Sequence, residues 1–351
     1  MADGAKRLRV CLAASGGGHV RQLLDLEPLW KEHDSFFVTE DSALGRSIAQ
    51  TQETYFVPHV ALGQAKLGKP FDMLKGGLVS LRKSFEIIRK TRPDVILTTG
   101  AGSMALIVAW GRLFGARVAL MDSFARFEKP SAFAKLIGPL AHVRIAQAEK
   151  LATNWKGSIA FDPFRTIDEP RPEKDSLLFG TVGATLAFPR LVDLVTRAQR
   201  DGVIEERIVL QTGKGASVEQ DGIEWAETYS FTEIQAMLDR ADFVVCHGGT
   251  GSLITALRAG CRVIAVPRRY ELGEHYDNHQ AEITENFRKR GLIEVADTPE
   301  EFVQAVEKLR QRDPVRATTD YTSLIGYLDD WMQDGGQTRA QIRSGSRPVV
   351  E

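Results

Sequence analysis

The stretch Phe243-Val-Val-Cys-His-Gly-Gly-Thr-Gly-Ser-Leu-Ile-Thr-Ala-Leu-Arg-Ala259 decides the fold class. Its apolar run Phe243–Cys246 predicts a buried strand, and the glycine-rich run His247–Ser252 predicts a loop. The next residues, Leu253–Ala259, have the spacing of a helix. A strand that passes through a glycine loop into a helix is the repeating step of parallel α/β folds.

The same step opens the chain, where the apolar run Leu8–Ala14 and the loop Ser15–Gly18 lead into the helical pattern Val20–Trp30. It occurs again where the loop Gly100–Ser103 separates a strand pattern from a helical one. Further strands are predicted at 36–38, 95–99, 117–121, 177–182, 208–211 and 263–266, and further helices at 104–114 and 190–200. The sequence therefore predicts an α/β chain of two doubly wound halves, with ligands at the carboxyl ends of the strands.

The chain of 351 residues is too long for one comfortable hydrophobic core, so two domains are expected. Pro163, Pro170 and Pro172 stand among charged residues and mark a linker. We therefore expect a first domain at 1–162, a linker at 163–176, a second domain at 177–334 and a flexible tail at 335–351.

Charge is balanced overall but not along the chain. The formal net charge of −1 argues against a nucleic-acid binder. Residues 1–165 nevertheless hold 23 Lys and Arg against 15 Asp and Glu, and the remainder holds 22 against 31. In residues 62–92, eight basic residues face two acidic ones and alternate with apolar side chains. This pattern predicts a segment that binds an anionic membrane surface; the alternative is a core helix with a solvated basic face.

Cys11, Cys246 and Cys261 lie in apolar runs without a CxxC spacing, which predicts buried thiols in a reducing cytosol. No apolar run reaches the roughly 18 residues that a membrane-spanning helix needs. The polar start indicates that there is no signal peptide. We expect a cytoplasmic protein that associates peripherally with the inner face of the plasma membrane.

The first glycine loop is suited to phosphate chemistry, because backbone N–H groups at a helix start attract anions. It is not a dinucleotide-binding fingerprint, since Arg21 stands where the third glycine is required. His19, at the mouth of the helix, is a candidate general base. The alternatives are a tight structural turn and a structural histidine.

The loop His247–Ser252 is the most specific signal, because its N–H groups can hold a diphosphate and Thr250 or Ser252 can cap the helix. Lys214 lies between two glycines, but Ile208 stands where a phosphate-binding P-loop has its first glycine, so a nucleoside triphosphatase is disfavoured. Arg268 and Arg269 suit a carboxylate or a phosphate; the alternative is a solvated pair of charges.

His275 and His279 have a spacing that can bind zinc on a helix, but no third ligand is evident. The chain also contains no Asp-x-Asp motif, which lowers the expectation of a metal-bridged diphosphate. We expect neither a metal nor a cofactor.

In combination, these motifs resemble a known family. The motifs of this chain that resemble the acceptor-binding half of that family are Ser15-Gly-Gly-Gly-His19, Thr99-Gly-Ala-Gly102 and Asp122-Ser-Phe-Ala-Arg126. The motifs that resemble the donor-binding half are Thr181-Val-Gly183, Gln211-Thr-Gly-Lys-Gly215, His247–Ser252 and Asn278-His-Gln280. Together they resemble the two-part transferases that add the second sugar to a polyprenyl pyrophosphate and, more distantly, the lipid II-forming N-acetylglucosaminyltransferase. The resemblance covers about residues 7–330, with both halves fused, and is strongest to the exopolysaccharide β-1,4-glucuronosyltransferases of the sphingan (gellan-type) pathway.

The resemblance implies a GT-B fold, in which two Rossmann-like domains enclose a cleft, and an inverting transfer that needs no metal. It implies that the second half binds a UDP-sugar, with its diphosphate near Gly248–Ser252 and its sugar near Gln280. Many relatives have a glutamate that holds the ribose where this chain has Thr255. A threonine hydroxyl is a weaker substitute.

The expected donor-binding residues are Gly183, Thr185, Gln211, Lys214, His247, Gly248, Gly249, Thr250, Gly251, Ser252, Thr255, Arg268, Arg269, Asn278 and Gln280. The expected acceptor and pyrophosphate residues are Ser15, Gly16, Gly17, Gly18, Gly100, Gly102, Ser103 and Arg126.

The working hypothesis is transfer of glucuronic acid from UDP-glucuronate to a glucosyl-pyrophosphoryl-polyprenol. His19 is the expected base, and Arg268 or Arg269 would hold the donor carboxylate. The alternatives are a transferase that uses UDP-N-acetylglucosamine, a UDP-N-acetylglucosamine 2-epimerase, and a non-catalytic membrane scaffold.

Overall fold

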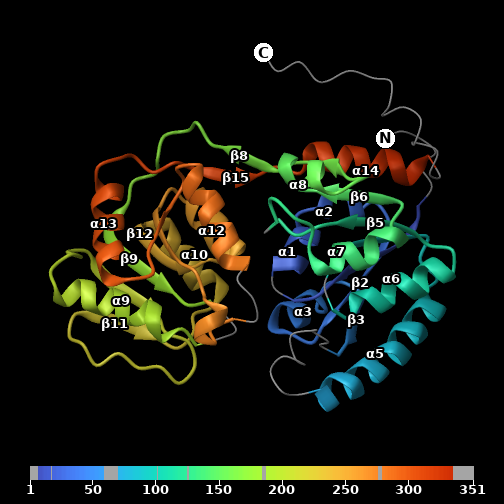
Figure 1. Cartoon of the computed structure of the whole chain (residues 1–351), viewed down its shortest axis with the longest axis horizontal. Coiled ribbons are helices and arrows are strands. Elements are labelled where there is room, and N and C mark those ends of the chain that lie inside the picture. The colour runs from blue at the N-terminus through green and yellow to red at the C-terminus, as the bar shows by residue number, and fades with distance from the viewer. Residues whose placement is uncertain are drawn as a thin grey trace. The chain divides into compact units, whose positions relative to one another are not determined.

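A computed structural model describes residues 7–16, 18–58, 70–100, 102–124, 126–183, 187–275 and 279–334. The chain forms two compact units (Figure 1). Unit 1 contains the described residues up to Phe124, Glu128–Asp162 and those from Tyr321 onward, and unit 2 contains Pro163–Asp320 with the short stretch around Arg126. Each unit is described by itself below.

Unit 1 is built on a seven-stranded parallel sheet with the order β3-β2-β1-β4-β5-β6-β7. Its strands are β1 (Arg9–Ala14), β2 (Asp34–Glu40), β3 (Thr54–Val57), β4 (Val95–Gly100), β5 (Arg117–Met121), β6 (Val143–Ala146) and β7 (Ile159–Ala160). The first strand lies inside the sheet and the order reverses beside it, which is the doubly wound arrangement of Rossmann-like domains.

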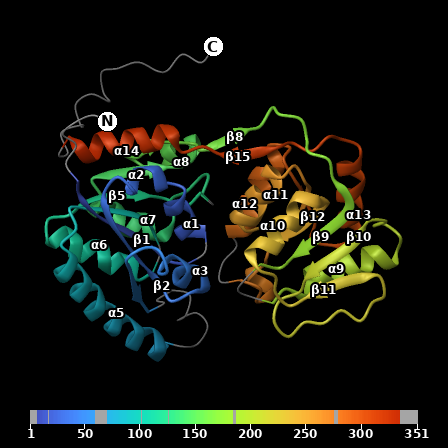
Figure 2. The same cartoon turned by 180° about the vertical axis from the view of Figure 1, so that it is seen from behind.

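The helices of unit 1 follow its strands. They are α1 (Gly18–Leu24), α2 (Glu27–Trp30), α3 (Ala43–Ile48), α5 (Pro70–Thr91), α6 (Met104–Leu113), α7 (Ala132–Ile137), the short 3₁₀ helix η1 (Gly138–Leu140), α8 (Glu149–Asn154) and α14 (Thr322–Gln333). Figures 1 and 2 show α5 beside α6 at one edge of the unit. The core beneath the helices is apolar and includes Val10, Leu12 and Leu97.

Unit 2 contains a six-stranded parallel sheet with the order β11-β10-β9-β12-β13-β14, which repeats the arrangement of unit 1. Its strands are β9 (Asp175–Thr181), β10 (Arg207–Gln211), β11 (Ile223–Ala226), β12 (Ala241–His247), β13 (Arg262–Val266) and β14 (Glu294–Val295). Its helices are α9 (Pro189–Arg200), α10 (Phe231–Arg240), α11 (Thr250–Arg258), the 3₁₀ helix η2 (Tyr270–Leu272), α12 (His279–Lys289) and α13 (Pro299–Arg310). Both halves therefore have the predicted doubly wound α/β fold.

The helix expected over Val20–Trp30 is instead two helices, α1 and α2. Pro28 lies in the first turn of α2, where its missing N–H costs nothing. In the interior of a single helix, the same proline would remove a hydrogen bond and clash with the preceding turn.

The second domain was expected to run from 177 to 334, but in the structure the residues from Tyr321 onward belong to unit 1. Helix α14 packs in unit 1, where Leu324, Leu328 and Trp331 belong to the same core as Val10 and Leu12. The expected linker at 163–176 is partly structured, because β8 (Phe164–Thr166) pairs antiparallel with β15 (Ala317–Thr319) and because β9 already begins at Asp175. The expected tail at 335–351 lies outside the described residues.

The three cysteines are buried thiols, as predicted. Burial raises the pKa of the Cys261 thiol to about 11 and that of Cys246 to about 12. Among the described residues, no helix is long and apolar enough to cross a membrane.

Candidate functional site

The predicted glycine loops lie at the points where the strand orders reverse. In unit 1 the reversal is between β1 and β4, and in unit 2 it is between β9 and β12. Doubly wound sheets bind ligands in the crevice that opens at the carboxyl ends of such strands. In unit 1 the two predicted loops follow these two strands, and in unit 2 the predicted loop His247–Ser252 follows β12, while the predicted motif Thr181–Gly183 lies at the end of β9.

In unit 2, three glycines allow the loops after β9 and β12 to approach each other and α12. A Cβ on Gly183, whose φ is +82°, would lie 2.7 Å from Cε1 of the His247 ring, and one on Gly249 would lie 2.4 Å from its Nε2. The His247 ring therefore rests against two glycine backbones. A Cβ on Gly248 would lie 2.8 Å from Cγ2 of Thr284 on α12.

Helix α11 begins at Thr250, three residues earlier than expected, with Gly249 as its N-cap. No side chain caps this end, so the expected capping by Thr250 or Ser252 is wrong. The first turn holds no acidic residue, and a Cβ on Gly251 would meet nothing within 4 Å. Because the first N–H groups of a helix lack intrahelical partners, the start of α11 is an open site for an anion.

Gln280 holds this loop to the end of β13. Its side chain is buried, and its Oε1 accepts hydrogen bonds of 3.1 Å from both the Gly248 N–H and the Arg268 N–H. The side-chain oxygen expected near the donor sugar is thus engaged with backbone, and it fixes the spacing between two strand ends.

The remaining hydroxyl and amide groups at this edge are partly engaged within the protein. The Thr181 hydroxyl donates to Oε1 of buried Gln211 over 2.5 Å and accepts from the Gly183 N–H over 3.2 Å. Lys214 is exposed in the loop after β10. The Thr255 hydroxyl donates to the Gly251 carbonyl over 2.7 Å, one turn back along α11.

Arg268 is 2% exposed and does not present a charge to solvent. Its Nη2 donates to the Val182 carbonyl and its Nη1 to the Ala187 carbonyl, each over 2.8 Å. The guanidinium lies 4.3 Å from the ring centre of Phe188, and burial lowers its pKa to about 10. The Arg268 guanidinium thus binds the carbonyls of Val182 and Ala187, on either side of the loop that follows β9, and its expected role toward a donor carboxylate stays a prediction.

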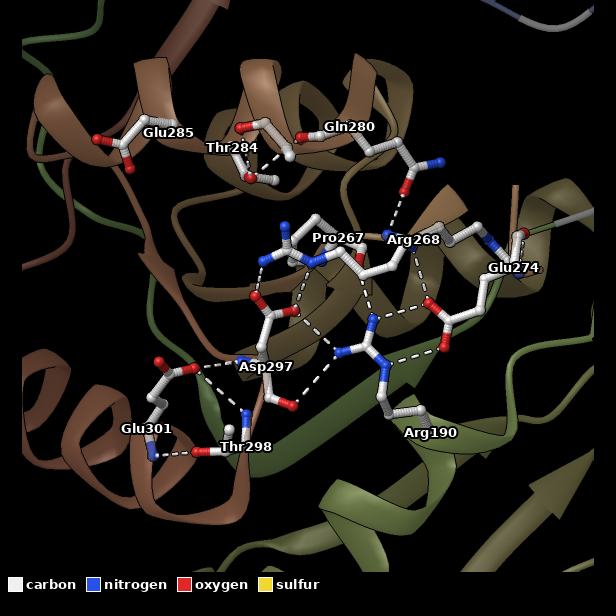
Figure 3. Close-up of polar contacts among 12 residues, drawn as sticks. Arg190, Pro267, Arg268, Glu274, Gln280, Thr284, Glu285, Asp297, Thr298 and Glu301 are labelled. Atoms are coloured by element: carbon white, nitrogen blue, oxygen red, sulfur yellow. Dashed lines mark hydrogen bonds and ion pairs between the residues drawn. The ribbon is translucent and has the colours of Figure 1, made fainter. Parts of the chain in front are cut away.

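Arg269 is also engaged, in a network of charges with Arg190, Glu274 and Asp297; Figure 3 labels these three partners. It forms an ion pair with Asp297, which raises its pKa. Arg190, from the first turn of α9, donates to Asp297 over 2.9 Å and to both carboxylate oxygens of Glu274 over 2.9 and 2.8 Å. The two arginines that were expected to bind a carboxylate of the ligand thus interact with carbonyls and carboxylates of the protein.

In unit 1, the loops after β1 and β4 are joined to each other. The Ser15 N–H donates to the Gly100 carbonyl over 2.8 Å, and the Thr99 hydroxyl donates to the His19 carbonyl over 2.9 Å. His19 is partly exposed in the first turn of α1. Gly18 is exposed and a Cβ there would meet nothing within 4 Å, so a ligand can approach the backbone.

The other expected acceptor residues differ in exposure. Ser103 is buried before α6. Gly102 has a φ of +49° and Gly100 one of +96°, while Gly16 has room for a Cβ. Arg126 belongs to unit 2, where it forms an ion pair of 3.2 Å with Glu282 on α12.

Sequence reasoning missed a buried polar network at the same edge of unit 1. Gln147 Nε2 donates to Oε1 of Gln22 on α1 over 2.5 Å and to the Asp122 carbonyl over 2.7 Å. The Tyr321 hydroxyl donates to Gln147 Oε1 over 3.3 Å, and burial raises its pKa. The sequence signal is weak, because Gln22, Gln147 and Tyr321 are isolated polar positions far apart in the chain, and only Asp122 belongs to a motif quoted above.

Gly17, Thr185 and Asn278 lie outside the described residues. Because α12 begins at His279, His275 precedes the helix and the two histidines do not share a helical face. The described part of the chain contains no group of three or more His, Cys, Asp or Glu residues placed to hold a metal ion.

Comparison with known proteins agrees with this arrangement. Residues 177–324 match the Glycosyltransferase family 28 C-terminal domain. The UDP-N-acetylglucosamine transferase subunit ALG13 of Yarrowia lipolytica is 29% identical over 147 residues, which cover 38% of this chain and 73% of that protein. The UDP-N-acetylglucosamine--N-acetylmuramyl-(pentapeptide) pyrophosphoryl-undecaprenol N-acetylglucosamine transferase of Chlorobium limicola is 24% identical over 208 residues, covering 54% and 56%.

Among solved structures, Acinetobacter baumannii MurG superposes with a TM-score of 0.60 at 16% identity, covering 93% of this chain and 99% of that one. This likeness shows that the fold is GT-B, with two Rossmann-like domains, as predicted. The fold and the matched domain define a glycosyltransferase of the GT-B type.

Proposed function

We propose that the protein transfers a sugar from a UDP-sugar to a sugar carried on a polyprenyl pyrophosphate, with inversion and without a metal. The observation that carries the donor half of this proposal is the open start of α11, with its glycine loop and uncapped N–H groups. A UDP diphosphate placed there gains hydrogen bonds and the favourable end of the helix dipole. The same groups stabilise UDP as the leaving group.

The donor that we propose first is UDP-N-acetylglucosamine, since it is named in both curated relatives. The second candidate is UDP-glucuronate, which rests on the motif resemblance to the sphingan enzymes. Its expected carboxylate partners, Arg268 and Arg269, bind the protein's own carbonyls and Asp297. A uronate therefore has less support from these two side chains than the sequence suggested.

The acceptor half of the proposal rests on unit 1. A hydroxyl of the lipid-linked sugar attacks the anomeric carbon, the bond from that carbon to the UDP oxygen breaks, and His19 takes the hydroxyl proton. The partial exposure of His19 at the start of α1, and the open backbone at Gly18, support this assignment. The lipid pyrophosphate would lie at the loops after β1 and β4.

We further propose that α5 brings the protein to an anionic membrane. Within its described side chains, Val79 and Leu81 are 41% and 39% exposed and line an apolar groove with Phe85 and Trp110. Arg82, Lys83, Arg89 and Lys90 are exposed on the same helix; residues 62–69 lie outside the described residues. Co-sedimentation with anionic vesicles that weakens with salt is expected, while equal binding to neutral vesicles would contradict it.

The diphosphate site is tested with the paired variants Gly251→Glu and Gly251→Gln, because this position has room for a side chain. A glutamate there stabilises the start of a helix but repels a diphosphate, whereas glutamine has the same shape without the charge. We expect calorimetry to show that Gly251→Gln binds UDP at least about tenfold more tightly than Gly251→Glu. Equal affinities would place the diphosphate elsewhere.

A further inference from the structure

The segment that follows β13, described over residues 267–275, folds back on itself. The Gly273 N–H donates to the Tyr270 carbonyl over 2.9 Å, and the Glu274 N–H donates to the Arg269 carbonyl over 3.1 Å. Gly273 has a φ of +70°, which makes the turn possible. Residues 269–274 are thus closed on themselves by two hydrogen bonds, and α12, the helix that carries Gln280, begins at His279.

Glu274 is the point at which this segment is held. Its side chain is 12% exposed, and its two carboxylate oxygens accept three N–H groups: Arg190 Nε at 2.9 Å, Arg190 Nη2 at 2.8 Å and the Arg269 backbone at 2.9 Å. A carboxylate that accepts a bidentate arginine and a backbone N–H is held in one orientation. No neutral side chain of the same shape can accept all three.

Arg190 connects that carboxylate to the rest of the strand edge (Figure 3). Besides Glu274, it donates to the Pro267 carbonyl over 2.7 Å and to Asp297 over 2.9 Å. Asp297 lies just before α13, where its N–H donates to Glu301 over 2.7 Å. The Arg190 guanidinium therefore joins the helix that follows β9 to the chain segments that follow β13 and β14.

The position of Arg190 would be electrostatically unfavourable without its carboxylate partners. It lies in the first turn of α9, where the helix dipole disfavours a cation. Its carboxylate partners offset that cost, and the side chain is only 20% exposed. The Arg190 guanidinium therefore binds Glu274, in the segment after β13, and is largely shielded from solvent.

We propose that Arg190 and Glu274 are positioning residues that preorganise unit 2 for a nucleoside-diphosphate sugar. By fixing the segment before α12, they place Gln280 so that its Oε1 holds the Gly248 and Arg268 N–H groups, and hence the glycine loop at the start of α11. The inference rests on the proposed function. Without the pair, the donor must order this segment when it binds, which weakens donor binding more than it slows the chemical step.

The test uses Glu274→Gln, which keeps the shape but turns an amide N–H towards an arginine N–H. We expect the Kd for UDP and the KM for the donor to rise about tenfold or more, with kcat changed by less than about threefold. Glu274→Asp, which keeps the charge, should restore part of the affinity. Arg190→Lys keeps a cation without the bidentate geometry and should lie between wild type and Glu274→Gln.

The matched control is Glu206→Gln. Glu206 is 10% exposed and accepts Arg310 Nη2 at 3.0 Å with both oxygens, at the opposite ends of the strands. It should leave KM and kcat unchanged. Folded Glu274→Gln and Arg190→Lys proteins with wild-type UDP affinity would overturn the inference, as would a fall in kcat at constant KM. A wild-type protein that binds no UDP would instead overturn the proposed function.

Discussion

His33 is a buried histidine near the start of β2, with 5% of its surface exposed. Within the described part of the chain, neither ring nitrogen has a hydrogen-bond partner. Burial lowers its pKa; Asp329 and Glu32 oppose the shift and Arg7 adds to it. The folded protein therefore resists protonation of this ring more than the unfolded chain does.

This depressed pKa predicts that stability falls as the pH drops below the ordinary histidine value of about 6.5, since the unfolded chain then binds the proton more readily. Above that pH, the ring is neutral in both states and contributes no pH dependence. As the pH falls from about 7.5 to about 5.5, we expect the free energy of unfolding to decrease less for His33→Leu than for the wild type. Urea unfolding followed by tryptophan fluorescence measures this, because Trp30, Trp110, Trp155 and Trp331 lie in unit 1. Identical pH dependence in both proteins would contradict the assignment.

At the scale of single residues, the sequence identified where polar side chains are needed but not what they bind. Arg268 and Arg269 do lie at the end of β13, as expected. Their partners, the Val182 carbonyl and Asp297, are 86 and 28 residues away along the chain. A pair of arginines that binds a ligand and a pair that binds the protein have the same local sequence, so only the tertiary structure separates them.

Helix α14 stabilises unit 1, although it follows unit 2 in the sequence. Arg117 at the start of β5 donates to two carbonyls in the last turn of α14, those of Trp331 and Met332, over 2.8 and 2.6 Å. Its guanidinium also lies 4.8 Å from the Trp331 ring centre. Leu328, on the inner face of the helix, is 1% exposed.

Truncating this buried leucine should therefore destabilise unit 1. We expect Leu328→Ala to cost about 2–5 kcal/mol, because it removes buried methyl groups and leaves a cavity. Hydrogen exchange should accelerate in peptides from β1 and β4, with little change in β9 and β12. Leu136→Ala, which alters an exposed leucine of the same unit, is the control. If protection from hydrogen exchange were lost only in β9 and β12, α14 would stabilise unit 2 and the assignment to unit 1 would be wrong.

At the scale of elements, local patterns predicted the strands and glycine loops well. Each strand–loop–helix step is encoded by neighbouring residues, and β1, β4 and β12 lead into the glycine loops that were expected after them. Long-range pairing was not predictable in the same way. The antiparallel pair β8–β15 joins residues about 150 positions apart, and α14 is assigned by its core contacts and not by its neighbours in the sequence.

At the scale of the whole molecule, the uneven charge of the sequence follows its two units. The basic excess of residues 1–165 includes exposed cations on α5, which suits a lipid surface. The acidic second half is the one that we propose binds an anionic donor. In that proposal the diphosphate would meet the N–H groups at the start of α11, and arginines of this half, such as Arg190 and Arg269, are already paired with carboxylates.

The most direct test of the central claim is transfer of labelled sugar. Wild-type protein is incubated with UDP-N-acetylglucosamine or UDP-glucuronate, labelled in the sugar, and with a glucosyl-pyrophosphoryl lipid, and the label in the lipid is counted. We predict that label enters the lipid from a UDP-sugar, first from UDP-N-acetylglucosamine, and only when the acceptor is present; label from UDP-glucuronate alone would favour the second donor candidate. Absence of labelled lipid with either donor, or conversion of UDP-N-acetylglucosamine to its 2-epimer without acceptor, would contradict the account.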